Sequence, residues 1–158
     1  MEIIYEPLTM EDRTDFYSLA GDPRVAANMR FDCPRSQEES DRILAGYIAE
    51  GNRSFALRSE PGGRLWGIFG FLKEEDPDVA DLSEMLLPEQ WGSGLGQQVL
   101  FQMVELAKAR KWYRCLDGYV LEHNTASRCM AEGVGLRQRK RLQLPDLQED
   151  LIVYRLEL

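Results

Sequence analysis

The stretch of this chain that decides its fold is Trp91-Gly92-Ser93-Gly94-Leu95-Gly96-Gln97-Gln98. It lies between an apolar, strand-like run at 82–87 and an amphipathic pattern that predicts a helix over 97–110. Glycine lets backbone N–H groups approach a ligand closely. The start of a helix adds unpaired N–H groups and the positive end of the helix dipole. The stretch therefore predicts a binding site for a diphosphate group.

Length and composition predict one soluble globular domain that spans residues 1–158. Hydrophobic residues make up 44% of the chain and charged residues 29%, as is typical of such domains. The net charge of −8 disfavours nucleic acid or an anionic membrane as the main partner. No apolar run reaches the ~18 residues of a membrane span, and the N-terminus lacks the features of a secretory signal. We therefore expect a cytoplasmic protein.

Cysteine and histidine content disfavours disulfides and a metal site. The three cysteines are scattered, without C-x-x-C spacing, at Cys33, Cys115 and Cys129. Scattered cysteines of this kind are read as reduced thiols. The one histidine, His123, adjoins a helix start, where a structural role is the simpler interpretation. A single histidine makes a histidine-based metal site improbable, and we expect no metal.

Periodicity predicts the remaining elements. The expected strands cover 3–5, 54–58, 65–72, 82–87, 115–121, 137–144 and 150–156. The expected helices cover 9–19, 36–50, 97–110 and 124–132. Capping boxes, formed by Thr9 with Asp12 and by Ser36 with Glu39, mark the starts of the first two helices. A parallel crossover around the helix at 97–110 would make the sheet mixed, in an α/β (α+β) fold.

Three classes of diphosphate ligand compete for the glycine-rich stretch. A P-loop needs Lys followed by Ser or Thr after its last glycine, whereas this chain has Gln97-Gln98. A dinucleotide-binding fingerprint needs its third glycine one position later, and it needs an acidic residue at the end of the next strand. Asp117 has roughly that spacing but falls inside its predicted strand. The third candidate is coenzyme A.

Two motifs support coenzyme A through a family resemblance. The run at 91–96 resembles the diphosphate motif Gln/Arg-x-x-Gly-x-Gly/Ala of the GNAT acetyltransferase superfamily, with Trp91 in place of Gln/Arg. The segments 124–127 and 132–136 are similar to the family's Asn-x-x-Ser and Glu-Lys-x-Gly-Phe, with Gly133 and Leu136 as departures. Further matches, in order, are Pro7-Leu8-Thr9 with Glu11-Asp12, Asp22-Pro23, Ser36 with Glu38-Glu39, and the run at 65–70. The whole chain thus resembles the RimJ/RimL-like branch.

This resemblance implies an acetyl-CoA-dependent N-acetyltransferase with a mixed, mostly antiparallel sheet of about six to seven strands and about four helices. Acetyl-CoA is the implied cosubstrate, and the acceptor is a protein N-terminus or a small-molecule amine, acetylated directly in a ternary complex. The residues implied to bind acetyl-CoA are Met85, Leu86, Leu87, Gly92, Ser93, Gly94, Leu95, Gly96, Gln97 and Asn124. A homodimer is a further expectation, because the run at 151–156 would leave an apolar edge.

Candidate catalytic groups follow from what acetyl transfer requires. Glu84 is a lone carboxylate in an apolar strand, where burial would raise its pKa and suit it as the base. The alternatives are a solvent-facing Glu84 and a base made of ordered water. Ser127 is a candidate proton donor to the leaving thiolate, since Ala131 stands where many relatives have a tyrosine. Local packing explains Ser127 equally well, and a plain helix cap would explain Asn124.

The acceptor side is expected at the irregular loop 28–34, as it is in the family. Its candidate wall residues are Met29, Arg30 and Phe31. The basic run Arg137, Arg139, Lys140 and Arg141 is most simply a solvated strand face, although an anionic substrate group could use it. The alternative function is a non-catalytic acyl-CoA-binding or regulatory module on the same fold.

Overall fold

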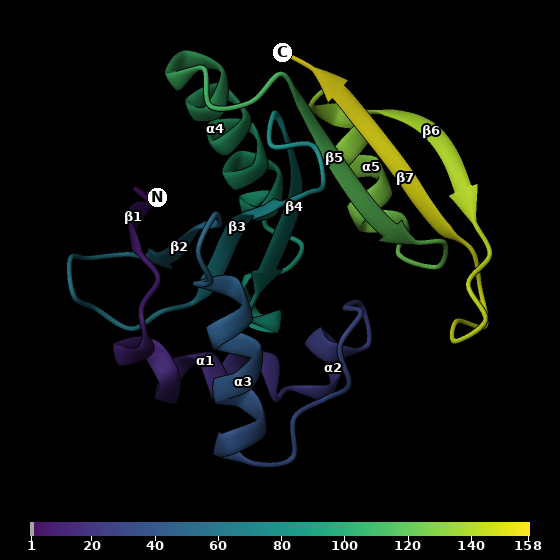
Figure 1. Cartoon of the computed structure of the whole chain (residues 1–158). Coiled ribbons are helices and arrows are strands. Elements are labelled where there is room, and N and C mark those ends of the chain that lie inside the picture. The colour runs from purple at the N-terminus through teal and green to yellow at the C-terminus, as the bar shows by residue number, and fades with distance from the viewer. Residues whose placement is uncertain (1) are drawn as a thin grey trace. The chain divides into compact units, whose positions relative to one another are not determined.

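The computed structural model describes residues 2–158 (Figure 1). Its strands are β1 (Ile4–Pro7), β2 (Arg53–Arg58), β3 (Gly67–Lys73), β4 (Val79–Leu86), β5 (Cys115–Leu121), β6 (Arg137–Leu142) and β7 (Leu151–Glu157). The α-helices are α1 (Arg13–Ala20), α2 (Pro23–Ala26), α3 (Gln37–Tyr47), α4 (Leu95–Arg110) and α5 (Thr125–Gly133), with short 3-10 helices η1 (Met10–Asp12) and η2 (Pro88–Gln90). The strand order is β1-β2-β3-β4-β5-β7-β6. The predicted mixed, mostly antiparallel sheet is confirmed.

The chain divides into two compact units, and strand β4 contributes residues to both. The first unit holds the chain up to Leu72 together with Ser83–Ser93, and the second holds Lys73–Leu82 together with Gly94–Leu158. The first four residues of β4 therefore belong to the second unit, and the rest belong to the first. Within residues 2–158, no helix is both long enough and apolar enough to cross a membrane.

In the first unit, β1, β2 and β3 form an antiparallel meander. Phe55 of β2 pairs with Pro7 on one side and with Phe69 on the other. The predicted strands at 54–58 and 65–72 are therefore neighbours, paired antiparallel in the sheet. Helices α1 and α3 contribute the fully buried Phe16 and Leu44, and the Phe16 ring packs edge-on against Tyr47 at 6.1 Å. Consecutive buried residues of β2 and β3 complete this core, among them Leu57, Ile68 and Phe69.

Side-chain caps start the helices of the first unit much as the sequence predicts. Thr9 and Asp12 form the predicted reciprocal capping box. The hydroxyl of Ser36 accepts the N–H of Glu39 at the start of α3, but the Glu39 carboxylate accepts the N–H of Arg35 instead of closing a box with Ser36. Helix α2 was not predicted, because its four residues are too few to show a helical period.

In the second unit, α4 connects β4 to the parallel strand β5, as predicted. The parallel register joins Val79–Leu82 to Cys115–Gly118. Buried Val79 and Ala80 extend β4 by three residues before the predicted start at Leu82, since both pair within this ladder. Helix α5 packs through Ala131 against Val120, Ile152 and Tyr154 of the strands and against Leu136, which directly precedes β6.

The C-terminal strand β7 lies inside the sheet and not at its edge. It pairs with β5 over Leu151–Glu157 and with β6 on its other side. The prediction of an apolar sheet edge at 151–156, on which the expected homodimer depends, is therefore wrong, because both sides of β7 have strand partners. Strand β6 takes the edge position, and five of its six residues are exposed, so the basic run of this strand is a solvated face.

Candidate active site

The glycine turn before α4 has the geometry that a bound anion needs. Gly92 and Gly94 have φ values of 77° and 80°, in the left-handed region that glycine adopts without strain. Gly94 occupies the N-cap position and supplies no capping side chain. Among residues 2–158, the N–H groups of Leu95, Gly96 and Gln97 have no acceptor, and the first helical bond runs from Gln98 to Gly94. These amides and the helix dipole fit a diphosphate group.

The end of β4 is held through its main chain. Met85, Leu86 and Leu87 are all buried. The Leu87 N–H donates to the Trp66 carbonyl at 2.9 Å, so this amide is engaged inside the protein. The Leu86 carbonyl accepts the indole N–H of Trp91 at 3.0 Å. This segment therefore has a fixed main-chain orientation.

Glycine at position 67 lets β3 lie close to the same segment. A Cβ on Gly67 would come within 2.8 Å of the Met85 carbonyl oxygen and 2.6 Å of a Leu86 methyl carbon. A contact with a carbonyl oxygen cannot be relieved by moving a side chain. Residue 67 must therefore be glycine for β3 and β4 to pack in this way.

Glu84 projects a carboxylate into an apolar environment. The residue as a whole is half-buried, but its Oε2 atom is buried and has no hydrogen-bond partner among residues 2–158. Burial raises the pKa of this carboxyl to about 8. Burial and the charge of Glu84 together raise the pKa of Tyr5 to about 12. A fully solvated Glu84, the alternative interpretation of the sequence, does not fit this burial.

Asn124 and Ser127 lie at the start of α5, in the second unit, whereas Glu84 belongs to the first. The side-chain oxygen of Asn124 accepts the N–H of Ser127 at 3.2 Å, so Asn124 caps the helix. The hydroxyl of Ser127 is half-buried and has no partner within the described part of the chain. The side chain of Gln97 reaches from α4 to the Met130 carbonyl at 3.5 Å.

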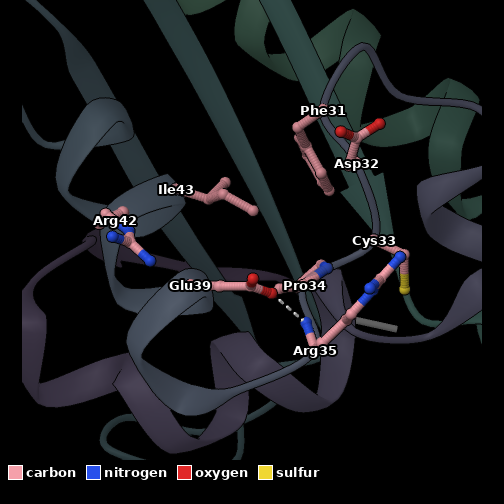
Figure 2. A pocket seen from close by; sticks show the side chains of 8 residues that line it. All are labelled: Phe31, Asp32, Cys33, Pro34, Arg35, Glu39, Arg42 and Ile43. Carbon is pink, nitrogen blue, oxygen red and sulfur yellow. Dashed lines mark hydrogen bonds between the residues drawn. The ribbon is translucent and has the colours of Figure 1, made fainter.

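A cavity of about 820 Å³ lies between the loop at 31–35 and the first turns of α3 (Figure 2). Its lining residues are Phe31, Asp32, Cys33, Pro34, Arg35, Glu39, Arg42 and Ile43. Of the predicted acceptor residues, Phe31 lines this cavity, whereas Met29 and Arg30 lie on the same loop outside the lining. Figure 2 shows the side chains of Phe31 and Ile43 pointing toward each other.

The remaining singled-out residues have structural partners or exposed positions. His123 bonds through Nδ1 to Glu149 Oε2 at 2.8 Å, which supports the structural interpretation of this histidine. Arg141 pairs with Glu122 and Asp150. Cys33, Cys115 and Cys129 are free thiols.

Sequence reasoning missed three features of this region. The indole bond of Trp91 joins residues that no local pattern links. The approach of Tyr5 to Glu84 brings together strands far apart in the chain. The capping signal at Ser36 marked the start of α3. It did not indicate that Glu39 and Ile43 of this helix line a cavity together with Phe31.

A model of the acetyltransferase (GNAT) domain matches residues 2–137. The chain belongs to the GNAT acetyltransferase family. It is accordingly an acetyl-CoA-dependent N-acetyltransferase, and acetyl-CoA is its cosubstrate. A search of curated protein sequences finds no match.

Solved GNAT structures share the fold of this acetyltransferase over nearly its whole length. RimL, a ribosomal L7/L12 alpha-N-protein acetyltransferase in complex with coenzyme A, superposes with a TM-score of 0.85 at 14% identity, covering 99% of this chain and 94% of RimL. Spermidine N-acetyltransferase from Vibrio cholerae, in complex with CoA and spermine, has a TM-score of 0.83 at 13% identity, with 98% and 95% covered. A GNAT acetyltransferase from Bacillus anthracis has a TM-score of 0.84 at 14% identity, with 99% and 95% covered.

Proposed function

We propose that this GNAT enzyme transfers the acetyl group of acetyl-CoA directly to a primary amine in a ternary complex, with Glu84 as the general base. The observation that carries the proposal is the buried, unpartnered Oε2 atom of Glu84, two residues before the main-chain segment at Leu86 and Leu87. A carboxyl group with a pKa of about 8 is well matched to accepting a proton near neutral pH.

The main chain on either side of η2 would bind two parts of acetyl-CoA, the diphosphate and the thioester arm. The N–H groups of the run 92–97 are proposed to hold the diphosphate, because those at the start of α4 lack acceptors within the described part of the chain. The main chain of Met85, Leu86 and Leu87 is proposed to hold the pantetheine and the thioester. Since the Leu87 N–H already donates to Trp66, its contribution would come through its carbonyl or through packing.

Asn124 and Ser127 are proposed to act on the sulfur side of the reaction. Asn124 would bind the pantetheine arm in addition to capping α5. The Ser127 hydroxyl has no hydrogen-bond partner among residues 2–158 and would donate a proton to the leaving thiolate. The thiol of coenzyme A is acidic, so its thiolate leaves with little assistance. Replacing Ser127 with alanine should therefore lower kcat far less than replacing Glu84 with glutamine.

The acceptor is proposed to bind beside the loop that carries Met29, Arg30 and Phe31. The cavity next to Phe31 combines an aromatic ring and Ile43 with two carboxylates, of Asp32 and Glu39, and two guanidinium groups, of Arg35 and Arg42. An amine with an apolar body would pack against the ring while one of the two carboxylates pairs with its cation. Both a protein N-terminus and a small-molecule amine have this chemistry. RimL and the spermidine enzyme represent these two classes among the similar structures.

The proposal is tested by incubating the enzyme with acetyl-CoA and a panel of amines, and by measuring free coenzyme A. The panel contains N-terminal peptides, amino acid amides, diamines and aryl-alkyl amines. We expect turnover with at least one class, and Phe31→Ala should raise the KM for that amine while the KM for acetyl-CoA changes less than about twofold. Turnover that falls equally for every amine would place Phe31 outside the acceptor site, and an inactive enzyme across the whole panel would contradict the proposed function.

The organisation of residues 1–158 as a single domain stays a prediction. We also propose a homodimer, which sedimentation would test; a monomer at working concentration would exclude it.

A further inference from the structure

Trp91 is an exposed aromatic residue that is nevertheless held in one position. The residue is 45% exposed and lies directly after η2. Its indole N–H donates to the carbonyl of Leu86 at 3.0 Å. Indole nitrogen has one donor and no acceptor, so this single bond satisfies it completely. The bond therefore joins the first residue of the glycine motif to the end of β4.

The peptide group that accepts this bond is held from both ends. Its carbonyl, from Leu86, accepts the Trp91 indole, and its N–H, from Leu87, donates to the Trp66 carbonyl at 2.9 Å. A peptide group is planar, so two bonds at opposite ends fix its orientation. Of these two partners, the Trp91 indole belongs to the glycine turn, whereas the Trp66 carbonyl does not.

The turn itself is tied together by short local bonds. The N–H of Trp91 donates to the Pro88 carbonyl at 3.0 Å, and the Ser93 hydroxyl donates to the Gln90 carbonyl at 2.8 Å. A displacement of Gly92 or Ser93 would therefore move the backbone of Trp91, and with it the indole. The bond to Leu86 would transmit this displacement to β4.

We propose that Trp91 is a positioning residue, which couples binding of the coenzyme A diphosphate to the orientation of the β4 main chain that holds the thioester. This inference rests on the proposed placement of these two groups. Binding of a remote, non-reacting part of a substrate raises the rate when that binding also orients the reacting part. The indole bond provides the mechanical connection between the two.

The test compares two acetyl donors. Acetyl-CoA carries the diphosphate, and S-acetylpantetheine carries the same thioester without it. In Trp91→Phe, which keeps an aromatic ring but lacks the N–H, we expect kcat with acetyl-CoA to fall about three- to tenfold, the effect of one lost hydrogen bond. The Kd for coenzyme A should change less than twofold, and kcat/KM with S-acetylpantetheine should change less than twofold.

Trp66→Phe is the matched control. The Trp66 indole N–H is buried and has no partner among residues 2–158, so the same chemical change removes no side-chain bond. The main-chain carbonyl of residue 66, which accepts the N–H of Leu87, is retained in this variant. We expect its ratio of rates with the two donors to match that of the wild type. Trp91→Tyr, which also lacks a donor at the indole nitrogen position, provides a second variant in case Trp91→Phe folds poorly.

Each outcome is decisive. An unchanged kcat in both Trp91 variants would overturn the inference. Equal losses with both donors would also overturn it, since they would show a general structural role. A wild-type enzyme that acetylates no amine from acetyl-CoA would contradict the proposed function instead. If the wild type does not use S-acetylpantetheine, the inference is tested by the Trp91 variants with acetyl-CoA alone. A lower kcat with an unchanged Kd for coenzyme A would then support it.

Discussion

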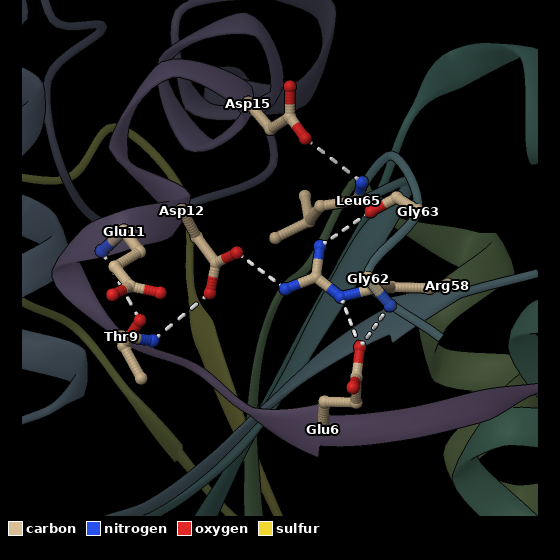
Figure 3. Close-up of polar contacts among 9 residues, drawn as sticks. All are labelled: Glu6, Thr9, Glu11, Asp12, Asp15, Arg58, Gly62, Gly63 and Leu65. Atoms are coloured by element: carbon tan, nitrogen blue, oxygen red, sulfur yellow. Dashed lines mark hydrogen bonds and ion pairs between the residues drawn. The ribbon is translucent and has the colours of Figure 1, made fainter. Parts of the chain in front are cut away.

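The guanidinium of Arg58 and the carboxylate of Asp12 form a buried ion pair that fastens β2 to the start of α1 (Figure 3). Their side chains are only 10% and 9% exposed. Arg58 also donates to Glu6 at 2.7 Å and to the Gly63 carbonyl at 2.9 Å, while Asp12 accepts the N–H of Thr9. The capping box of the first helix is thereby continuous with a charged cluster in the interior of the first unit.

Removing one member of this pair should strongly destabilise the protein. In Asp12→Asn, the Arg58 charge stays buried with Glu6 as its one remaining acidic partner, and we expect the free energy of unfolding to fall by about 3–5 kcal/mol. Urea denaturation measures this change. The exposed pair of Arg64 and Glu89, 3.8 Å apart, is the control, and Arg64→Gln should cost less than about 1 kcal/mol. Similar effects of both substitutions would contradict the importance of burial.

Activity should depend on the ionisation of Glu84. Its carboxylate form, the base, becomes populated as pH rises through a pKa of about 8, so kcat/KM should rise to a plateau above that pH. Glu84→Gln should lower kcat by about 10²- to 10⁴-fold and remove this step. The assay needs an acceptor whose amine has a pKa below about 6, because the ionisation of the amine then lies outside the pH range in which Glu84 titrates. A wild-type profile that is flat between pH 6 and pH 9 would exclude Glu84 as the base.

The same carboxyl predicts how stability varies with pH. The pKa of Glu84 is raised in the folded state from 4.5 to about 8, so folding favours its protonated form. Its stabilising contribution is complete below pH 4.5 and is lost as pH rises through about 8. The wild type should lose about 2 kcal/mol between pH 6 and pH 8 relative to Glu84→Gln. Parallel stability curves for the two proteins in urea would show that the carboxyl is ionised throughout.

The left-handed backbone of the glycine turn should be required for binding acetyl-CoA. A Cβ on Gly94 would meet no atom of residues 2–158 within 4 Å, so the φ of 80° is what opposes Gly94→Ala, at a cost of roughly 1–2 kcal/mol. Relief of this strain would turn the first amides of α4 away, and we expect the Kd for acetyl-CoA to rise roughly tenfold. Calorimetric titration measures this change.

Gly46 is the matched control for that substitution. It lies in the last turn of α3, where a Cβ would also meet no atom of the described residues within 4 Å, but its φ is negative. Gly46→Ala should therefore stabilise the protein by about 0.5–1 kcal/mol without changing the Kd for acetyl-CoA. Unchanged binding in Gly94→Ala would show that the turn does not hold the diphosphate.

Short-range signals in the sequence were sufficient for the elements and the family. The helix caps at Thr9, Ser36 and Asn124 lie within a few residues of the amides that they bond, so spacing along the chain reveals them. The predicted bounds of β5, Cys115–Leu121, agree with the structure because a mostly apolar run, interrupted only by Asp117 and Gly118, is bounded by the charged residues Arg114 and Glu122. The glycines of the turn before α4 likewise reveal a backbone requirement that is local.

Long-range relationships needed the tertiary structure. The interior position of β7 depends on which strands flank it, and the apolar pattern of 151–156 is the same for an edge strand and a central one. The burial of Glu84 depends on what covers its strand, which no neighbouring residue specifies. The sequence by itself therefore determined the local structure, the glycine turn and the family, because backbone preferences and periodicity act over a few residues. Only the tertiary structure decided the pKa of Glu84, the cavity at Phe31 and the bond from Trp91 to Leu86, because desolvation and contact depend on groups that folding brings together.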